Sequence, residues 1–327
     1  MKTYKWGIIG TGFIAQKMAD ALLFVPNVKL AAVASRSMDT ANIFAAKYNC
    51  KGYGNYEDIA NDPEIDIAYI ATPHSLHLEN TLMCLSKGKH VLCEKPFAVN
   101  GSEVRKMIEA ASRNNVFLME ALWTRFNPRI IKAKQVIDSG RLGKIKLIRA
   151  DFGERKPVEL NNRFYSKELI GGSLLDMGIY PLFIAQLFMG KPQSIHAAAG
   201  FASTGVDTNC SFTLGYNDDS LSVICSTMLA ETDNTVTIYC EKGTIFFSKY
   251  VYAPEKIVVV PLDEESEDIT VELSGNIYNY EAAEVVSCLE QGLTQSLMWS
   301  WQDSLLLIDT LDEIRRQIGL VFEGHDC

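Results

Sequence analysis

The feature that most constrains the fold is a glycine-rich turn near the N-terminus. The apolar run KWGII (residues 5–9) is followed by GTGFIA (residues 10–15) and by AQKMADALLF, whose apolar spacing is helical. Gly10 permits a tight turn, Gly12 lets the backbone approach a pyrophosphate, and Ala15 keeps the helix close to the strand. The helix N-terminus presents N–H groups to phosphates. The turn therefore predicts dinucleotide binding, and the alternative is a glycine turn without a ligand.

Three further runs extend this pattern along the first third of the chain. Residues 28–34, 65–71 and 89–94 are β-rich and are separated by helical stretches. This alternation predicts parallel strands joined by crossover helices. We therefore expect an α/β protein whose residues 1–122 form a Rossmann doubly wound parallel sheet.

The end of the second predicted strand bears on the choice of coenzyme. An NAD-selective site usually carries an acidic residue there, roughly 20 residues beyond the glycines. This chain instead has Arg36 between Ser35 and Ser37, and a guanidinium flanked by hydroxyls suits a 2′-phosphate. Alternatively, Ser37 caps the next helix and Arg36 is solvated, and Asp39 is close enough to keep NAD open. NADP is the expected coenzyme.

Polar residues follow two other predicted strands, in ATPHSLH (residues 71–77) and CEKP (residues 93–96). Ligands of open α/β sheets bind at such carboxyl ends. Pro96 disfavours helical geometry at Lys95, so the lysine is held at the strand tip and suits proton transfer. A surface lysine is the alternative. His74 and His77 have the spacing of a metal pair, but dinucleotide chemistry needs no metal and we expect none.

A second signature, GGSLLDMGIYP, covers residues 171–181. In a helix that opens after the two glycines, Asp176 and Tyr180 are four residues apart and project from the same face. The alternative is an ordinary core helix in which Asp176 bonds to nearby backbone. The pattern of this segment alone leaves both interpretations open.

The second half of the chain has a different pattern. After a helical stretch at 127–143, strand-like runs follow at short spacing from 144 to 261, and helical patterns return at 278–291 and 300–318. Short turns such as residues 216–219 predict a mostly antiparallel sheet. We expect residues 123–327 to form an α+β domain with a large open-faced sheet. Apolar residues at successive positions indicate that a second subunit covers the open face, and loops of the same chain are the alternative.

Composition excludes several classes of partner. The 327-residue chain has a net charge of -9 and no basic stripe, which argues against nucleic acid. No apolar run reaches ~18 residues, so no membrane segment is expected. The eight cysteines include no C-x-x-C pair and read as small buried hydrophobes of a reducing compartment, so a cytoplasmic location is expected.

Together, GIIGTGFIA, ATPHSLH, CEKP followed by Asn100, MEALWTRFNP (residues 119–128) and GGSLLDMGIYP resemble the glucose-fructose oxidoreductase / inositol dehydrogenase (Gfo/Idh/MocA) family of NAD(P)-dependent oxidoreductases. The most similar branch holds dimeric dihydrodiol dehydrogenase and NADP-dependent D-xylose dehydrogenase. The resemblance covers nearly the whole length. It implies hydride transfer to or from a CH–OH group of a sugar, cyclic polyol or dihydrodiol, and a homodimer or higher homo-oligomer formed through the C-terminal sheet.

The resemblance also implies roles for individual residues. Lys95 and Tyr180 share the acid/base role, and Asp176 positions the substrate hydroxyl or tunes Lys95; many members have His where this chain has Tyr180. His74 and His77 lie along one wall of the substrate pocket, which is completed by Trp123, Arg125, Phe126 and, as a weaker candidate, Arg163. The implied coenzyme-binding residues are Gly10, Thr11, Gly12, Phe13, Ile14, Ser35, Arg36, Thr72, Pro73, His77, Glu94 and Lys95. The alternative function is a non-catalytic dinucleotide-sensing regulatory protein of the same fold.

Overall fold

The computed structural model describes residues 2–158 and 162–326, and the chain forms two compact units. The first comprises Met1–Phe126 and Leu273–Leu305, and the second comprises Asn127–Glu272 and Leu306–Cys327. The chain first passes from one unit to the other after Phe126, four residues beyond the expected boundary at residue 122. The expected division also gave Leu273–Leu305 to the second domain, whereas this segment folds with the first. Its helical pattern does not reveal which sheet it covers.

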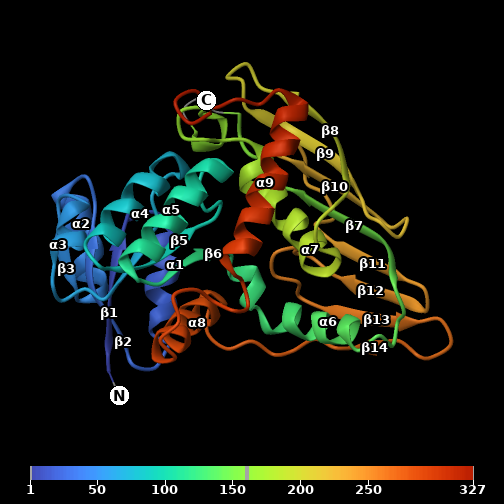
Figure 1. Ribbon diagram of the computed structural model, residues 1–327, viewed down its shortest axis with the longest axis horizontal. Helices are drawn as coiled ribbons and strands as arrows, with labels where there is room; N and C mark the ends of the chain where they lie inside the picture. The colour runs from blue at the N-terminus through green and yellow to red at the C-terminus, as the bar shows by residue number, and fades with distance from the viewer. Residues whose placement is uncertain (1, 159–161, 327) are drawn as a thin grey trace. The chain divides into compact units, whose positions relative to one another are not determined.

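The first unit is built on a six-stranded parallel sheet of order β3-β2-β1-β4-β5-β6 (Figure 1). The strand order reverses between β1 and β4, which is where ligands of doubly wound sheets bind. The predicted Rossmann sheet is thus confirmed. Its strands are β1 (Tyr4–Ile9), β2 (Val28–Ala34), β3 (Lys51–Tyr53), β4 (Ile67–Ile70), β5 (His90–Glu94) and β6 (Leu118–Ala121). Its helices include α1 (Phe13–Leu22), α2 (Met38–Tyr48), α3 (Glu57–Asn61), α4 (His77–Ser86), α5 (Gly101–Asn114) and α8 (Tyr278–Glu290).

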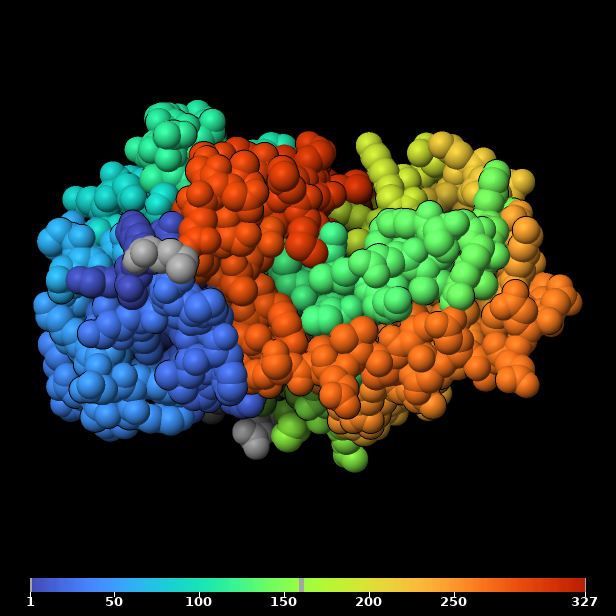
Figure 2. All heavy atoms as spheres, turned by 90° about the horizontal axis from the view of Figure 1, so that it is seen from below, coloured from blue at the N-terminus to red at the C-terminus, as the bar shows by residue number. Residues whose placement is uncertain are grey.

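Burial explains why the central strand β4 is continuously apolar. Every residue of Ile67–Ile70 is buried, as expected for a parallel strand covered on both faces. The returning segment supplies part of that cover, because α8 packs against α1 (Figures 1 and 2). Asn276 marks this contact, since its Nδ2 donates to the backbone oxygen of Lys17 at 2.7 Å. Leu273–Leu305 is therefore an integral part of the first unit.

The second unit contains an eight-stranded sheet of order β14-β13-β12-β11-β7-β10-β9-β8. The β7–β10 pair is parallel and the other pairs are antiparallel, so the predicted mostly antiparallel sheet is confirmed. The strands are β7 (Ile145–Gly153), β8 (Ser194–Phe201), β9 (Asp207–Gly215), β10 (Leu221–Thr227), β11 (Val236–Cys240), β12 (Gly243–Phe247), β13 (Ile257–Pro261) and β14 (Glu267–Asp268). The remaining helices are α6 (Pro128–Asp138), α7 (Ile179–Met189) and α9 (Trp301–Ile318).

The two faces of this sheet differ in exposure. Along β10, Ser222, Ile224 and Ser226 are buried, and the residues between them are exposed. The helix α7 contacts β7 and β10 (Figure 1). The exposed face nevertheless carries large apolar side chains, with Leu221 43% and Val260 45% exposed. One face therefore forms the core of the unit and the other presents apolar surface.

All cysteines among the described residues are free thiols. Cys84, Cys93, Cys210 and Cys288 are buried, as expected of small hydrophobes, but Cys225 is exposed and Cys50 and Cys240 are partly exposed, so the expectation is wrong for those three. Among the helices of the described residues, none is both long enough and apolar enough to span a membrane.

Candidate active site

The glycine turn has the geometry that phosphate binding requires. Gly10 adopts φ +112°, and a Cβ at this position would lie 2.5 Å from the carbonyl oxygen of Ala71, so only glycine fits. Gly12 is the N-cap of α1, makes no side-chain cap hydrogen bond and faces open space where a Cβ would stand. The first turn of α1 contains no acidic residue. The residues present thus fit a dinucleotide pyrophosphate held by backbone N–H groups.

The end of β2 gathers hydroxyl groups beside an exposed guanidinium. Ser35 Oγ accepts from the Ser37 N–H at 3.4 Å, and Thr11 Oγ1 donates to it at 3.5 Å. Ser37 caps α2, because its Oγ accepts from the Thr40 N–H at 3.4 Å. Arg36 is exposed between the two serines. Ser37 therefore caps α2, which is the alternative interpretation of this residue. Arg36 is exposed to solvent close to the glycine turn of residues 10–15 (the coenzyme turn).

His77 ties together the two loops that follow β4 and β5. Its side chain is fully buried, with Nδ1 2.9 Å from Pro96 O and Nε2 3.0 Å from Thr72 O. Burial lowers the pKa of His77, and the two carbonyl oxygens oppose that shift. His74 lies edge-on to this ring at a centroid distance of 5.5 Å. Both ring nitrogens of His77 thus contact backbone, so its evident role is to set the positions of Thr72–Pro73 and Lys95–Pro96.

Within the described ranges, no group of three or more His, Cys, Asp or Glu side chains is arranged to hold a metal ion.

Lys95 is half-buried and follows a buried carboxyl at the tip of β5. Glu94 Oε2 accepts from the Lys95 N–H at 3.1 Å, and Glu94 Oε1 accepts from the Tyr69 hydroxyl. Burial raises the pKa of Glu94 to about 7, although the Tyr69 hydrogen bond and the Lys95 charge oppose the rise. The Lys95–Pro96 peptide bond is cis. The strand tip therefore offers an ammonium beside a carboxyl that titrates near neutrality.

Glu281, on α8, is a buried carboxyl that no sequence motif pointed to. It is fully buried, and neither carboxyl oxygen has a hydrogen-bond partner among the described residues. Burial and the charge of Glu94 raise the pKa of Glu281 well above its usual range. In the sequence, this residue is marked only by its place on the apolar face of the predicted helix 278–291.

The aromatic residues after β6 pack within the first unit. Trp123, Arg125 and Phe126 belong to a 3₁₀ turn, Trp123–Phe126, and the two aromatic residues are 4% and 3% exposed. The Trp123 ring lies 4.8 Å from that of Tyr278, and Arg125 Nε donates to the backbone oxygen of Met298 at 2.8 Å. The returning segment thus fixes the turn that was expected to line the substrate pocket.

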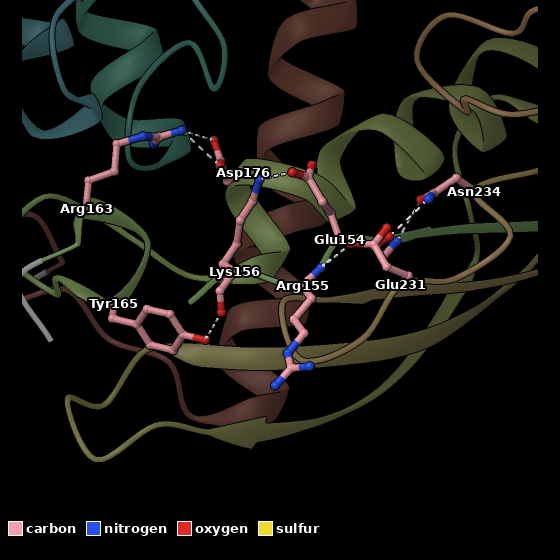
Figure 3. Close-up of polar contacts among 9 residues, drawn as sticks. Glu154, Arg155, Lys156, Arg163, Tyr165, Asp176, Glu231 and Asn234 are labelled. Atoms are coloured by element: carbon pink, nitrogen blue, oxygen red, sulfur yellow. Dashed lines mark hydrogen bonds and ion pairs between the residues drawn. The ribbon is translucent and has the colours of Figure 1, made fainter. Parts of the chain in front are cut away.

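In the second unit, a helix opens after Gly171 and Gly172 as expected, but its first part is a π-helical turn, Leu174–Gly178, that precedes α7. Asp176 lies in that turn and is 8% exposed. Arg163 Nη2 lies 3.1 Å from its Oδ2 and 3.3 Å from its Oδ1 (Figure 3). The Arg163 side chain is half-exposed. Asp176 is thus a nearly buried carboxylate held by a cation from a surface loop.

Tyr180 sits in an aromatic cluster of the second unit. Its ring centroid lies 5.9 Å from that of Phe152 and 5.3 Å from that of Tyr252, and Tyr250 stacks on Tyr252. Burial raises the pKa of Tyr252 to about 12, so it is a neutral phenol at physiological pH. Sequence reasoning missed both tyrosines, because the segment between β12 and β13 carries no motif beyond its aromatic residues.

A second cation lies on the loop that bears Arg163. Lys156 Nζ is 2.5 Å from Glu154 Oε1 (Figure 3), and it lies 4.7 Å from the centroid of the Phe164 ring. Arg163 Cζ lies 4.2 Å from the same centroid. Each of these two cations therefore pairs with a carboxylate, Lys156 with Glu154 and Arg163 with Asp176.

Each unit thus assembles one part of the expected site. The first brings together the coenzyme turn, the two strand-end loops and Lys95. The second brings together Arg163, Asp176 and Tyr180, all near the start of α7.

Comparisons with known proteins agree with this division. The family described as "oxidoreductase family, NAD-binding Rossmann fold" matches residues 4–122, and the GFO/IDH/MocA C-terminal domain matches residues 130–246. Among solved structures, the 3-ketoreductase KijD10 from Actinomadura kijaniata with NADP and TDP-benzene aligns with a TM-score of 0.88 at 22% identity, over 97% of this chain and 98% of that one. Levoglucosan dehydrogenase with NADH and levoglucosan aligns at 0.87 and 20% identity, over 97% of each chain. These structures share the fold.

Curated relatives are more similar in sequence. The trans-1,2-dihydrobenzene-1,2-diol dehydrogenase of Xenopus laevis is 38% identical over 97% of this chain and 99% of its own length. That of Danio rerio is 39% identical over 97% of this chain and 98% of its own length. The chain therefore belongs to the GFO/IDH/MocA family and is an NAD(P)-dependent oxidoreductase.

Proposed function

We propose that this protein is an NADP-preferring dehydrogenase or reductase that acts on a CH–OH group of a small ring, a dihydrodiol, cyclic polyol or sugar. The observation that carries the proposal is the aromatic cluster around Tyr180, in which Phe152 and Tyr252 lie within 6 Å of its ring centroid. Flat aromatic faces suit the apolar face of a ring-shaped substrate. The names of the curated relatives support a dihydrodiol as the first substrate to test.

Tyr180 and Lys95 supply the acid/base chemistry in this proposal. When bound, the nicotinamide supplies the hydride acceptor or donor. A phenol with an ordinary pKa near ~10 is a weak base at neutral pH unless a nearby cation favours the phenolate. We assign that cation to Lys95 and the removal of the hydroxyl proton to Tyr180. Asp176, fixed by Arg163, accepts a hydrogen bond from a neighbouring substrate hydroxyl and so orients the ring.

The roles of Lys95 and Tyr180 are tested by turnover on a panel of dihydrodiols, cyclic polyols and aldoses. Lys95→Met and Tyr180→Phe should each lower kcat by ~10²–10⁴-fold, the usual contribution of a positioned proton-transfer group. Coenzyme affinity, measured by fluorescence titration, should change little in Tyr180→Phe, because Tyr180 lies outside the coenzyme turn. An unchanged kcat in both variants would contradict the assignment. Tight NADPH binding by a wild-type protein inactive on the whole panel would favour the dinucleotide sensor.

The preference for NADP rests on Arg36. A guanidinium gives charge-assisted hydrogen bonds to a 2′-phosphate, and the hydroxyl of Ser35, after β2, lies 3.5 Å from that of Thr11, after β1. Arg36→Ala should weaken NADPH binding by about 10- to 100-fold and leave NADH binding nearly unchanged. Equal losses for both coenzymes would place Arg36 outside the 2′-phosphate site. Lys29→Ala is the control for loss of a positive charge, because Lys29 lies on β2, the strand that precedes Arg36.

We further propose that the protein is a homodimer formed through the exposed face of the C-terminal sheet, with the apolar side chains of that face as support. A cytoplasmic location is proposed from the free thiols among the described residues, which suit a reducing compartment.

A further inference from the structure

The π-helical turn that carries Asp176 is held by two neighbouring strands of the second unit. The Ser173 hydroxyl, fully buried just before the turn, donates to Asp207 Oδ2 at 2.8 Å, and the Leu174 N–H donates to the same oxygen at 2.7 Å. Ser173 Oγ also lies 3.0 Å from Ser226 Oγ. Asp207 is the first residue of β9, and Ser226 is near the end of β10. The turn is therefore capped by a carboxylate from outside its own segment.

The glycines on either side of the turn make this close approach possible. Gly172 adopts φ +124°, and a Cβ there would lie 2.2 Å from Asp207 Oδ1. A Cβ on Gly178 would lie 3.0 Å from Ser226 Oγ. The glycines of the GGSLLDMG sequence thus fit the positions of Asp207 and Ser226.

The carboxylate of Asp207 is energetically unfavourable at this buried position. It is fully buried, burial raises the pKa of its carboxyl, and its Oδ1 accepts no hydrogen bond among the described residues. A buried carboxylate destabilises a fold unless its partners offset the loss of hydration. The hydrogen bonds that its Oδ2 accepts come from Ser173, just before the turn, and from Leu174, the first residue of the turn. The hydrogen bonds of Asp207 therefore stabilise one short element, the π-helical turn.

A π-helical turn differs from an α-helical one in a way that matters for side-chain direction. Its hydrogen bonds run over one more residue than those of an α-helix, so it holds an extra residue in the turn. If the segment relaxed to an α-helix, residues on one side would rotate by about 100° relative to those on the other. Asp176 lies within the turn and Tyr180 follows it, so such a change would alter their relative directions.

We propose that Asp207 is a positioning residue for the reaction: its bonds to Ser173 and Leu174 hold the π-helical turn and so set the directions of Asp176 and Tyr180. This inference rests on the proposed function of those two residues. Asp207 touches neither substrate nor coenzyme in this account and acts only through the turn.

The first test is a double-mutant cycle on kcat with Asp207→Ala and Asp176→Asn. Asp207→Ala should lower kcat by ~10²-fold, the effect of a misplacement of about 1 Å, with NADPH affinity unchanged because the coenzyme turn lies in the first unit. In the Asp176→Asn background the same change should cost less than it does in the wild type, because one of the two groups that the turn positions is already disabled. Factors that multiply independently, or a kcat unchanged in Asp207→Ala, would overturn the inference.

A matched control separates positioning from general destabilisation. Asp151 is also a carboxylate that anchors backbone in the second unit, accepting from the Asn234 N–H at 2.8 Å and from the Thr232 hydroxyl. Asp151→Ala should lower the melting temperature without coupling to Asp176→Asn. If Asp207→Ala does not fold, Asp207→Asn and Ser173→Ala take its place in the cycle and must show the same coupling.

A readout without turnover keeps this inference distinct from the proposed function. Hydrogen exchange of the amides of residues 174–180 should speed up at least about tenfold in Asp207→Asn and remain unchanged in Asp151→Ala. Unchanged exchange in Asp207→Asn would overturn the inference even in an active enzyme. If the wild-type protein is inactive on every substrate and Asp207→Asn still exchanges faster, the proposed function is contradicted. The role of Asp207 in holding the turn then stands.

Discussion

Glu94 shows how a single buried residue makes stability depend on pH. The unfolded chain releases the Glu94 proton near the ordinary pKa of about 4.3, whereas the folded chain keeps it until about pH 7. Between these values the folded state binds more protons, so the free energy of unfolding falls as pH rises, and above about pH 7 the contribution is constant. The total effect is on the order of 3 kcal/mol.

Urea unfolding over this pH range checks the prediction. Glu94→Gln should unfold with a shallower pH dependence than wild type, because it removes one proton-binding carboxyl. Glu64→Gln is the control, since Glu64 forms an exposed ion pair with Lys5 and should leave the slope unchanged. Equal slopes for wild type and Glu94→Gln would mean that Glu94 titrates normally in the folded state.

Residues with local backbone roles could be predicted from sequence, and residues recruited from afar could not. Gly10 and the Ser37 cap follow from turn and helix geometry within a few residues: Gly10 adopts the predicted tight turn, and the cap is the alternative that the sequence left open for Ser37. Glu281 and Tyr252 belong to no motif, and they reach Tyr69, Glu94 and Tyr180 only through contacts between distant segments. The partner of Asp176 was missed for the same reason, because Arg163 was expected only as a residue of the pocket wall.

At the scale of elements, the glycine turn between β1 and α1 is tightly constrained. Gly10→Ala combines an unfavourable positive φ with a Cβ 2.5 Å from Ala71 O, so the turn must move. We expect at least a tenfold loss of coenzyme affinity, roughly 1.4 kcal/mol or more, measured by isothermal titration. Gly88→Ala is the control, because Gly88 has φ +75° but open space around its Cβ. It should cost stability only, and equal coenzyme affinity in both variants would contradict the prediction.

Elements were predicted well where side-chain periodicity decides them. The strands β2 and β5 and the helices α8 and α9 begin and end within about two residues of the expected bounds. The π-helical turn Leu174–Gly178 was not predicted, because the spacing of its apolar residues also fits an α-helix. What selects the turn is its contact with Asp207 and Ser226, which lie more than thirty residues away in sequence.

At the scale of the whole molecule, the sequence predicted two sheets but not how the chain is shared between their units. Leu273–Leu305 follows the last strand of the second sheet, yet packs with the first unit through α8. Amphipathic periodicity shows that a helix has an apolar face, but it does not identify the surface that covers that face. Tertiary contacts, such as those of Asn276 with Lys17 and of Arg125 with Met298, assign the segment to the first unit.

The exposed face of the second sheet carries large apolar side chains. Strand register places Leu221 of β10 and Val260 of β13 on one face, through the paired positions Leu147, Tyr239 and Thr244. An apolar face of this kind is unfavourable in water and is stabilised when a second copy buries it. Because directly paired residues share a face, a charged substitution on this face places a charge against the apolar side chains of the contact.

Leu221→Glu should therefore convert the proposed dimer to a monomer, as measured by sedimentation velocity across a dilution series. Its strand neighbours Leu147 and Gly215 offer no charge to pair with the new carboxylate. Leu23→Glu is the control, because Leu23 is 78% exposed at the end of α1, in the first unit. It should leave the mass unchanged. A wild-type protein that sediments as a monomer, or a Leu221→Glu variant that remains dimeric, would show that this sheet face does not form the subunit interface.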